Sequence, residues 1–174
     1  MNQIIFLALG LLVVFVVMAF LKAKLGSPSD NADIYYARKT LFTAAERSFL
    51  GVLEPQLPRD IRVFGKVRLE DVLGVKAGLS RPERLAARNK INRKHVDFLL
   101  VRASDLAPIG GIELDDSSHE EEDRKQRDAF VDSAFASAGL PLLHVPAQKA
   151  YNPAEVKAKI AQLLNQPTTN AVNP

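Results

Sequence analysis

The chain opens with a long apolar stretch and changes abruptly to mixed sequence. Ile4 to Leu21 carries no charged side chain, and Lys22 and Lys24 follow at once. A stretch of this length is just sufficient to cross a bilayer as a helix. It predicts a transmembrane anchor over residues 1–22 of a single-pass protein of the inner (cytoplasmic) membrane, with the C-terminal domain in the cytoplasm. A cleaved signal peptide is the alternative, but the basic residues that normally precede one are missing.

Behind the anchor, the composition predicts a polar linker over residues 23–40, one folded domain over 41–165 and a disordered tail over 166–174. Alternating apolar residues predict strands, and apolar residues at helical spacing predict helices. The predicted strands cover residues 61–69, 96–102, 109–114 and 140–145. One predicted helix begins near residue 43, and three more cover residues 81–88, 120–138 and 153–164. This order predicts an α/β fold with a mixed sheet flanked by helices.

The first predicted strand has one apolar and one polar face. Alternation assigns Ile61, Val63, Gly65, Val67 and Leu69 to the apolar face, and Arg62, Phe64, Lys66 and Arg68 to the other face. Just upstream, Thr43 and Glu46 have the spacing of a capping box at the start of a helix. The capping role explains Glu46 without function, and a place in a metal site is the alternative.

Composition excludes several kinds of chemistry. The 174 residues include no cysteine, so disulfide scaffolds, thiolate zinc sites and cysteine nucleophiles are excluded. The net charge of +3 is modest, but its distribution is uneven. Between residues 74 and 94, cations greatly outnumber the single acid Glu83. We expect six of them to bind nucleic-acid phosphates, with anionic lipid headgroups as the alternative. These are Arg81, Arg84, Arg88, Lys90, Arg93 and Lys94.

Two carboxylates lie inside apolar runs that read as strands. Asp97 lies in the run from His95 to Val101, and Glu113 lies in the run from Gly110 to Asp116. Burying an unpaired carboxylate is costly, and divalent metal binding is a common reason for it. If the two strands form a hairpin, Asp97 lies opposite or nearly opposite Glu113. Alternation places Asp97 on one face with Leu99 and Val101. It places Glu113 on one face with Gly111 and Asp115.

If the turn register points their side chains the same way, Asp97, Glu113 and Asp115 form one acidic pocket that suits Mg²⁺ or Mn²⁺. Such an ion polarises a phosphodiester and lowers the pKa of bound water. The simpler interpretation is that both acids pair with neighbouring cations such as Arg93 or Lys94.

Asp97, a hairpin and then Glu113-x-Asp115 resemble the PD-(D/E)xK nuclease superfamily. The chain is more closely similar to a bacterial domain family of unknown function that often follows a membrane anchor. The run from Ile112 to His119 also resembles very-short-patch repair endonucleases. Further motifs that carry the likeness are 43–49, 62–64, 94–98, 127–130 and 138–143.

The resemblance implies a restriction-endonuclease-like three-layer core and a Mg-dependent endonuclease acting on DNA. Its metal ligands would be Asp97 and Glu113, and Asp115 and His119 would join them as catalytic residues.

One position departs from the superfamily pattern. The lysine that normally follows two residues after the acid is Asp115 here, so His119, Lys125 or Arg124 would have to compensate. Asp115 and Asp116 can also serve as N-cap residues, and His144 is expected to be a packed strand residue. A nuclease fold that only binds nucleic acid or a protein at the membrane is therefore the alternative function. A membrane-surface module unrelated to nucleic acid is a third hypothesis.

Overall fold

The computed structural model describes residues 2–24, 34–115 and 122–166. They belong to two compact units, Met1–Lys39 and Thr40–Pro174. The first unit contains helix α1 (Asn2–Lys24), whose apolar side chains between Ile5 and Leu21 are exposed. Within the described ranges, the structure contains no helix with both the length and the apolar character needed to cross a membrane. The transmembrane anchor predicted for residues 1–22 is therefore not supported.

The second unit is a four-stranded sheet with helices on both faces. The strands lie in the order β1-β2-β3-β4; β1 and β2 are antiparallel, as are β2 and β3, and β3 and β4 are parallel. The strands are β1 (Ile61–Arg68), β2 (His95–Arg102), β3 (Pro108–Asp115) and β4 (Leu142–Pro146). The helices are α2 (Ala44–Leu53), η2 (Glu54–Gln56), α3 (Leu69–Val72), α4 (Arg81–Ile91), α5 (Glu122–Ser137) and α6 (Pro153–Leu164). The predicted mixed sheet with flanking helices is confirmed.

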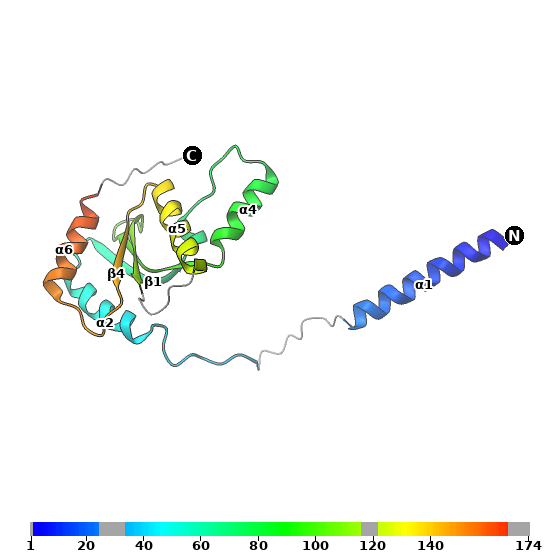
Figure 1. The fold of residues 1–174 in the computed structure, drawn as a ribbon, viewed down its shortest axis with the longest axis horizontal. Helices are drawn as coiled ribbons and strands as arrows, with labels where there is room; N and C mark the ends of the chain where they lie inside the picture. Colours follow the sequence, from blue (N-terminus) through cyan, green and yellow to red (C-terminus); the bar gives the residue numbers. More distant parts are fainter. Residues whose placement is uncertain (1, 25–33, 116–121, 167–174) are drawn as a thin grey trace. The chain divides into compact units, whose positions relative to one another are not determined.

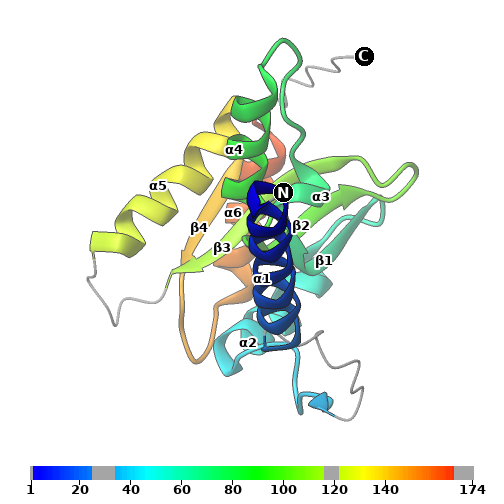
Figure 2. The same ribbon diagram turned by 90° about the vertical axis from the view of Figure 1, so that its right-hand side faces the viewer.

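The helices form two layers around the sheet. Figure 1 shows α2 and α6 on one side of the sheet and α4 and α5 on the other. Figure 2 shows the same unit turned by 90°, with α5 running beside β4. The helix between two parallel neighbouring strands is α5, as expected for a crossover connection.

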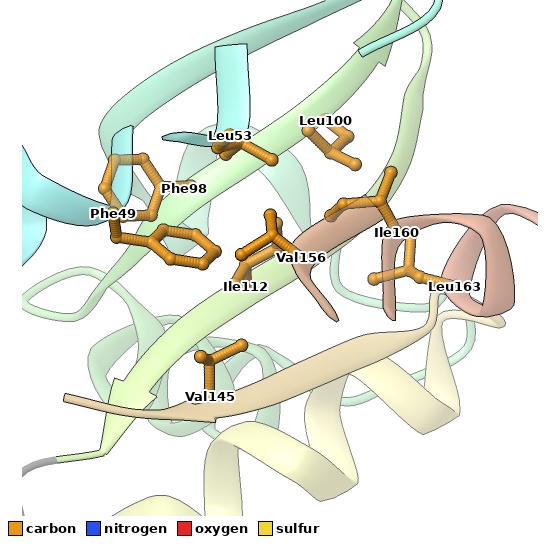
Figure 3. Close-up of a cluster of buried hydrophobic side chains, with 9 residues drawn as sticks. All are labelled: Phe49, Leu53, Phe98, Leu100, Ile112, Val145, Val156, Ile160 and Leu163. Atoms are coloured by element: carbon orange, nitrogen blue, oxygen red, sulfur yellow. The ribbon is translucent and has the colours of Figure 1, made fainter. Parts of the chain in front are cut away.

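The first core cluster fills the space between the sheet and the layer of α2 and α6. Figure 3 shows how Phe49 and Leu53 of α2 meet Phe98 and Ile112 of the central strands. Phe49 and Phe98 lie with ring centroids 5.6 Å apart. Each such side chain contributes roughly 1.5–3 kcal/mol when it is fully buried. The cluster therefore fixes α2, and with it Glu46, against the sheet.

The second core cluster lies on the opposite face of the sheet. It joins Leu99 and Val101 of β2 to Val131 and Phe135 of α5. Gly111 of β3 makes this close approach possible, because a Cβ atom there would come within 2.8 Å of the Phe135 ring. The glycine therefore leaves room for α5 to pack close to the sheet, which brings the polar residues on the same side of α5 near β4.

The side-chain alternation of two strands breaks at the same point in the sheet. In β1, Val63 packs against the first core cluster, but Val67 packs against the second. In β2, Phe98 belongs to the first cluster and Val96 to the second. A regular strand would keep both members of each pair on one face.

Lys66 and Asp97 lie between these residues, and Lys66 has a left-handed backbone with φ of 55°. The regular alternation predicted for residues 61–69 is therefore wrong from Lys66 onward, because the left-handed residue reverses the faces.

Candidate functional site

Asp97 and Glu113 meet where β2 and β3 separate. The last bridge at this end pairs Phe98 with Ile112, so one further step would place Asp97 opposite Glu113. Beyond this bridge, the Leu114 amide of β3 donates its hydrogen bond to a side chain of β2 and not to the β2 backbone: Asp97 Oδ2 accepts it at 3.0 Å. The carboxylate of Asp97 is thereby held in a fixed position at the opening between the strands.

Glu113 lies in an unfavourable place for a negative charge. Burial, the nearby charge of Asp97 and a hydrogen bond with Asp97 together raise the pKa of Glu113 to about 8. The positive charges of His144 and Lys66 counteract this rise in part. At neutral pH Glu113 therefore keeps its proton.

Lys66 places a cation beside these acids. Its Nζ lies 2.6 Å from Glu46 Oε1 and 2.8 Å from Asp97 Oδ1. Burial alone would lower the pKa of Lys66, but the hydrogen bonds and charges of Asp97 and Glu46 outweigh it and raise the pKa. Lys66 therefore stays an ammonium. We call Glu46, Lys66, Asp97 and Glu113 the Lys66 cluster.

Glu46 has two roles. Its Oε2 accepts a hydrogen bond of 2.8 Å from the Thr43 amide, which completes the predicted capping box. Its Oε1 binds Lys66. The cap orients the carboxylate so that one oxygen serves the helix end and the other points to the cluster. The capping role predicted for Glu46 is therefore confirmed. Its other oxygen joins the charged cluster, and a place in a metal site stays a prediction.

A second charged group lies around His144 on β4. His144 is the register partner of Glu113 and binds Asp115 Oδ1 through Nδ1 at 2.9 Å and Asp132 Oδ1 through Nε2 at 2.7 Å. Burial lowers the pKa of His144, but the two aspartates outweigh it and raise the pKa, which favours the imidazolium. We call Asp115, Asp132 and His144 the His144 cluster. Asp115 is thus engaged within the protein by its contact with His144.

Neither cluster is a preformed metal site. Among residues 2–24, 34–115 and 122–166, no group of three or more acidic or histidine side chains is arranged to hold a metal ion. In the Lys66 cluster, the ammonium occupies the position next to Asp97 that a bound cation would need. Asp97 and Glu113 nevertheless supply hard oxygen donors and excess negative charge, which is the donor chemistry that Mg²⁺ and Mn²⁺ require.

The predicted phosphate-binding cations lie on α4 and directly behind it. Arg81, Arg84, Arg88 and Lys90 belong to the helix, and Arg93 and Lys94 follow it. Some of this charge is engaged within the protein. Arg88 Nε lies 3.7 Å from Glu70 Oε1. Lys90 and Lys94 lie over the Phe130 ring at 5.9 and 5.6 Å. The structure therefore places these cations on one side of the sheet, in the same layer as α5.

Comparison with protein families places the chain in a known group. The family model described as "Protein of unknown function (DUF2726)" matches residues 38–163. The chain belongs to this family. The matched DUF2726 segment runs from before α2 to the end of α6 and includes both charged clusters, but not α1. No curated protein and no solved structure matches the chain.

Several predicted residues lie outside the described part of the chain. They are His119 and Asp116, and the side chains of Lys125 and Arg124. Conversely, the sequence did not assign a site role to Lys66, His144 or Asp132. Lys66 was hidden by the assumption of regular alternation. A usable signal was its place directly after Gly65, in a strand predicted close to that of Asp97. Asp132 lies one helical turn before Phe135, which the apolar pattern did identify.

Proposed function

We propose that the protein is a metal-dependent phosphodiesterase that acts on DNA, with a restriction-endonuclease-like core. The single observation that carries the proposal is the meeting of Asp97 and Glu113 at the point where β2 and β3 separate, beside the Lys66 ammonium. Two acids on adjacent strands with a neighbouring lysine are the groups that such a reaction needs. The family to which the chain belongs carries no described activity, so the proposal depends on this geometry.

Asp97 and Glu113 would hold Mg²⁺ or Mn²⁺. Burial and the neighbouring charge of Asp97 make ionisation of Glu113 costly. A divalent cation would offset this cost and release the proton of Glu113. When bound, the metal would polarise a phosphodiester and lower the pKa of a bound water.

Lys66 would stabilise negative charge that develops on the phosphate. Because its pKa is raised, Lys66 cannot accept a proton at neutral pH, so its role is electrostatic. In this way a lysine from β1 supplies the charge that the sequence pattern lacks at Asp115. The basic residues of α4 would bind the phosphates of the same DNA further from the reaction centre.

The test is cleavage of plasmid and linear DNA by the full chain in mild detergent with Mg²⁺ or Mn²⁺. We expect Asp97→Asn and Glu113→Gln to lower the rate by at least about 100-fold, because each removes a charge needed at the reacting phosphate. Asp105→Asn is the matched control. Asp105 is an exposed acid in the turn of the same hairpin, paired with Arg102 at 2.7 Å, and its loss should leave the rate unchanged. A wild type that cleaves nothing, or a Glu113→Gln variant with full activity, would overturn the proposal.

The alternative function is a nuclease fold that binds DNA or a protein without cleaving. One observation favours it: Asp115 replaces the motif lysine and is engaged with His144. This alternative predicts DNA binding that is unaffected by a chelator, with no turnover under any metal condition. Metal-dependent cleavage that is lost in Glu113→Gln would exclude it.

We also propose that α1 attaches the protein to the cytoplasmic membrane, with the second unit in the cytoplasm. The support is the continuous run of exposed apolar side chains on α1, which water solvates poorly. In cell fractions, we expect detergent to release the protein from membranes and high salt to leave it bound. Leu12→Lys in α1 should weaken this attachment. Release by salt alone would show that the attachment is electrostatic and would contradict the proposal.

A further inference from the structure

The Lys66 ammonium lies against the carboxylate that the proposed metal would bind. It contacts Asp97 Oδ1 at 2.8 Å, and Asp97 Oδ2 accepts a hydrogen bond of 3.0 Å from the Leu114 amide. Each oxygen still has a free lone pair, but a divalent cation on Oδ1 would be repelled by the ammonium beside the same atom. Tight metal binding to Asp97 therefore favours the departure of Lys66 from this oxygen.

Lys66 is held there against its backbone preference. A residue with a side chain is disfavoured in the left-handed region, and Lys66 has φ of 55° within a strand. Such a conformation persists only when the surroundings enforce it, and it is common at functional positions. Here the break in alternation at Lys66 and Asp97 coincides with the contacts of Lys66 to two acids.

Glu46 provides a second, independent acceptor for the same ammonium. The Glu46–Lys66 contact of 2.6 Å is the shorter of the two, and the helix cap anchors the other oxygen of Glu46. If Lys66 lost Asp97, Glu46 would still retain it within the cluster. Of the two partners of the ammonium, a metal would therefore bind Asp97, and Glu46 would stay in contact with Lys66.

We propose that Lys66 is an internal counter-ion of Asp97 that a divalent cation displaces, and that Glu46 then keeps the ammonium at the site. This inference rests on the proposed metal dependence of the same site. In the metal-free protein, Lys66 neutralises a buried carboxylate that would otherwise be unpaired. In the metal-bound protein, Lys66 no longer contacts Asp97, and Glu46 acts as the positioning residue that keeps its charge near the substrate phosphate.

The test measures Mn²⁺ binding to the full chain in detergent by the electron paramagnetic resonance of free Mn²⁺. We expect Lys66→Met to bind Mn²⁺ at least about 10-fold more tightly than wild type, because no ammonium competes for Asp97. Lys157→Met is the matched control. It removes an exposed lysine of α6 that belongs to neither charged cluster, so its Mn²⁺ affinity should equal that of wild type.

A second variant keeps the test decisive if Lys66→Met does not fold. Lys66→Gly also removes the ammonium, and glycine accepts the left-handed backbone without strain. Thermal unfolding monitored by circular dichroism identifies which variants are folded. A folded variant without Lys66 that binds Mn²⁺ no more tightly than wild type would overturn the proposal.

Glu46→Gln tests the retained partner. Glutamine preserves the capping box but not the charge, so Lys66 should hold Asp97 more strongly and Mn²⁺ should bind several-fold more weakly. Unchanged or tighter binding in a folded Glu46→Gln variant would overturn the assigned role of Glu46. Mn²⁺ binding in these patterns without DNA cleavage would contradict the proposed function alone, because this readout does not depend on turnover.

Discussion

The Lys66 cluster contains one basic side chain and three acids, and the His144 cluster contains one basic side chain and two acids. The two clusters also differ in burial. The side chains of Glu46 and Asp97 are only 9% and 11% exposed, whereas those of Asp115 and Asp132 are both 53% exposed. Similar hydrogen bonds therefore have different consequences. Water screens the charges around His144, while the charges around Lys66 depend on one another. The comparison indicates that the stability of the fold depends more on the charges of the Lys66 cluster than on those of the His144 cluster.

The two clusters should differ most in the free energy of unfolding that is lost when the central cation, Lys66 or His144, is removed. Lys66→Met leaves two buried carboxylates without their partner, and we expect a loss of about 3 kcal/mol in the free energy of unfolding. Urea unfolding of the full chain in detergent measures it, with Lys157→Met at an exposed position of α6 as the control. A loss below about 1 kcal/mol would mean that the Lys66 cluster behaves as a surface ion pair, as described for exposed pairs.

The pH dependence of stability should distinguish Glu113 from the exposed acids. The folded protein keeps a proton on Glu113 up to its raised pKa of about 8, whereas an unfolded glutamate releases it near its ordinary pKa of 4.5. Between these values the folded state binds more protons, so the free energy of unfolding falls as pH rises and levels off above about 8. The slope is at most about 1.4 kcal/mol per pH unit.

Glu113→Gln should flatten this slope in unfolding experiments between pH 5.5 and 8.5. Asp105→Asn should keep it, because the pKa of Asp105 is lowered by the Ala107 amide and that acid titrates below the window. Equal slopes in wild type and Glu113→Gln would contradict the raised pKa of Glu113.

Backbone strain at Lys66 should have a smaller effect. Lys66→Ala and Lys66→Gly both remove the ammonium, but only glycine suits φ of 55°. We expect Lys66→Gly to be more stable than Lys66→Ala by about 1 kcal/mol. The comparison uses two unfolding curves under one condition. An alanine variant of equal or greater stability would show that the left-handed backbone carries no strain.

The smallest effect should come from His144. At pH 6, we expect His144→Gln to cost about 0.5 kcal/mol, reduced by salt, because both acids of its cluster are exposed. The raised pKa of His144 means that its stabilisation is present at low pH and disappears as pH rises through that pKa. At pH 9 the variant should match wild type. A loss above about 2 kcal/mol at pH 6 would place His144 with the buried cluster.

The sequence predicted much of the fold because apolar spacing follows burial directly. The α6 boundaries and the Thr43–Glu46 cap were predicted from pattern alone and agree with the structure. Asp97 and Glu113 were selected because acids inside apolar strands are costly. Lys66 was not selected, because alternation assigned it to the polar face, and a left-handed residue within a strand leaves no mark in hydrophobic spacing. The partners of His144 were also hidden, since Asp132 reaches it from a helix that only the folded chain brings close.

The left-handed residue also has a consequence for association between molecules. β1 is an edge strand of the sheet, and an exposed edge is a template for strands from other chains. A regular strand of eight residues would present an unbroken row of backbone donors and acceptors. The left-handed backbone at Lys66, the sixth of these eight residues, interrupts this row, and a charged side chain stands at the break. We therefore expect the residue that gives the site its cation also to disfavour edge-to-edge aggregation of the domain.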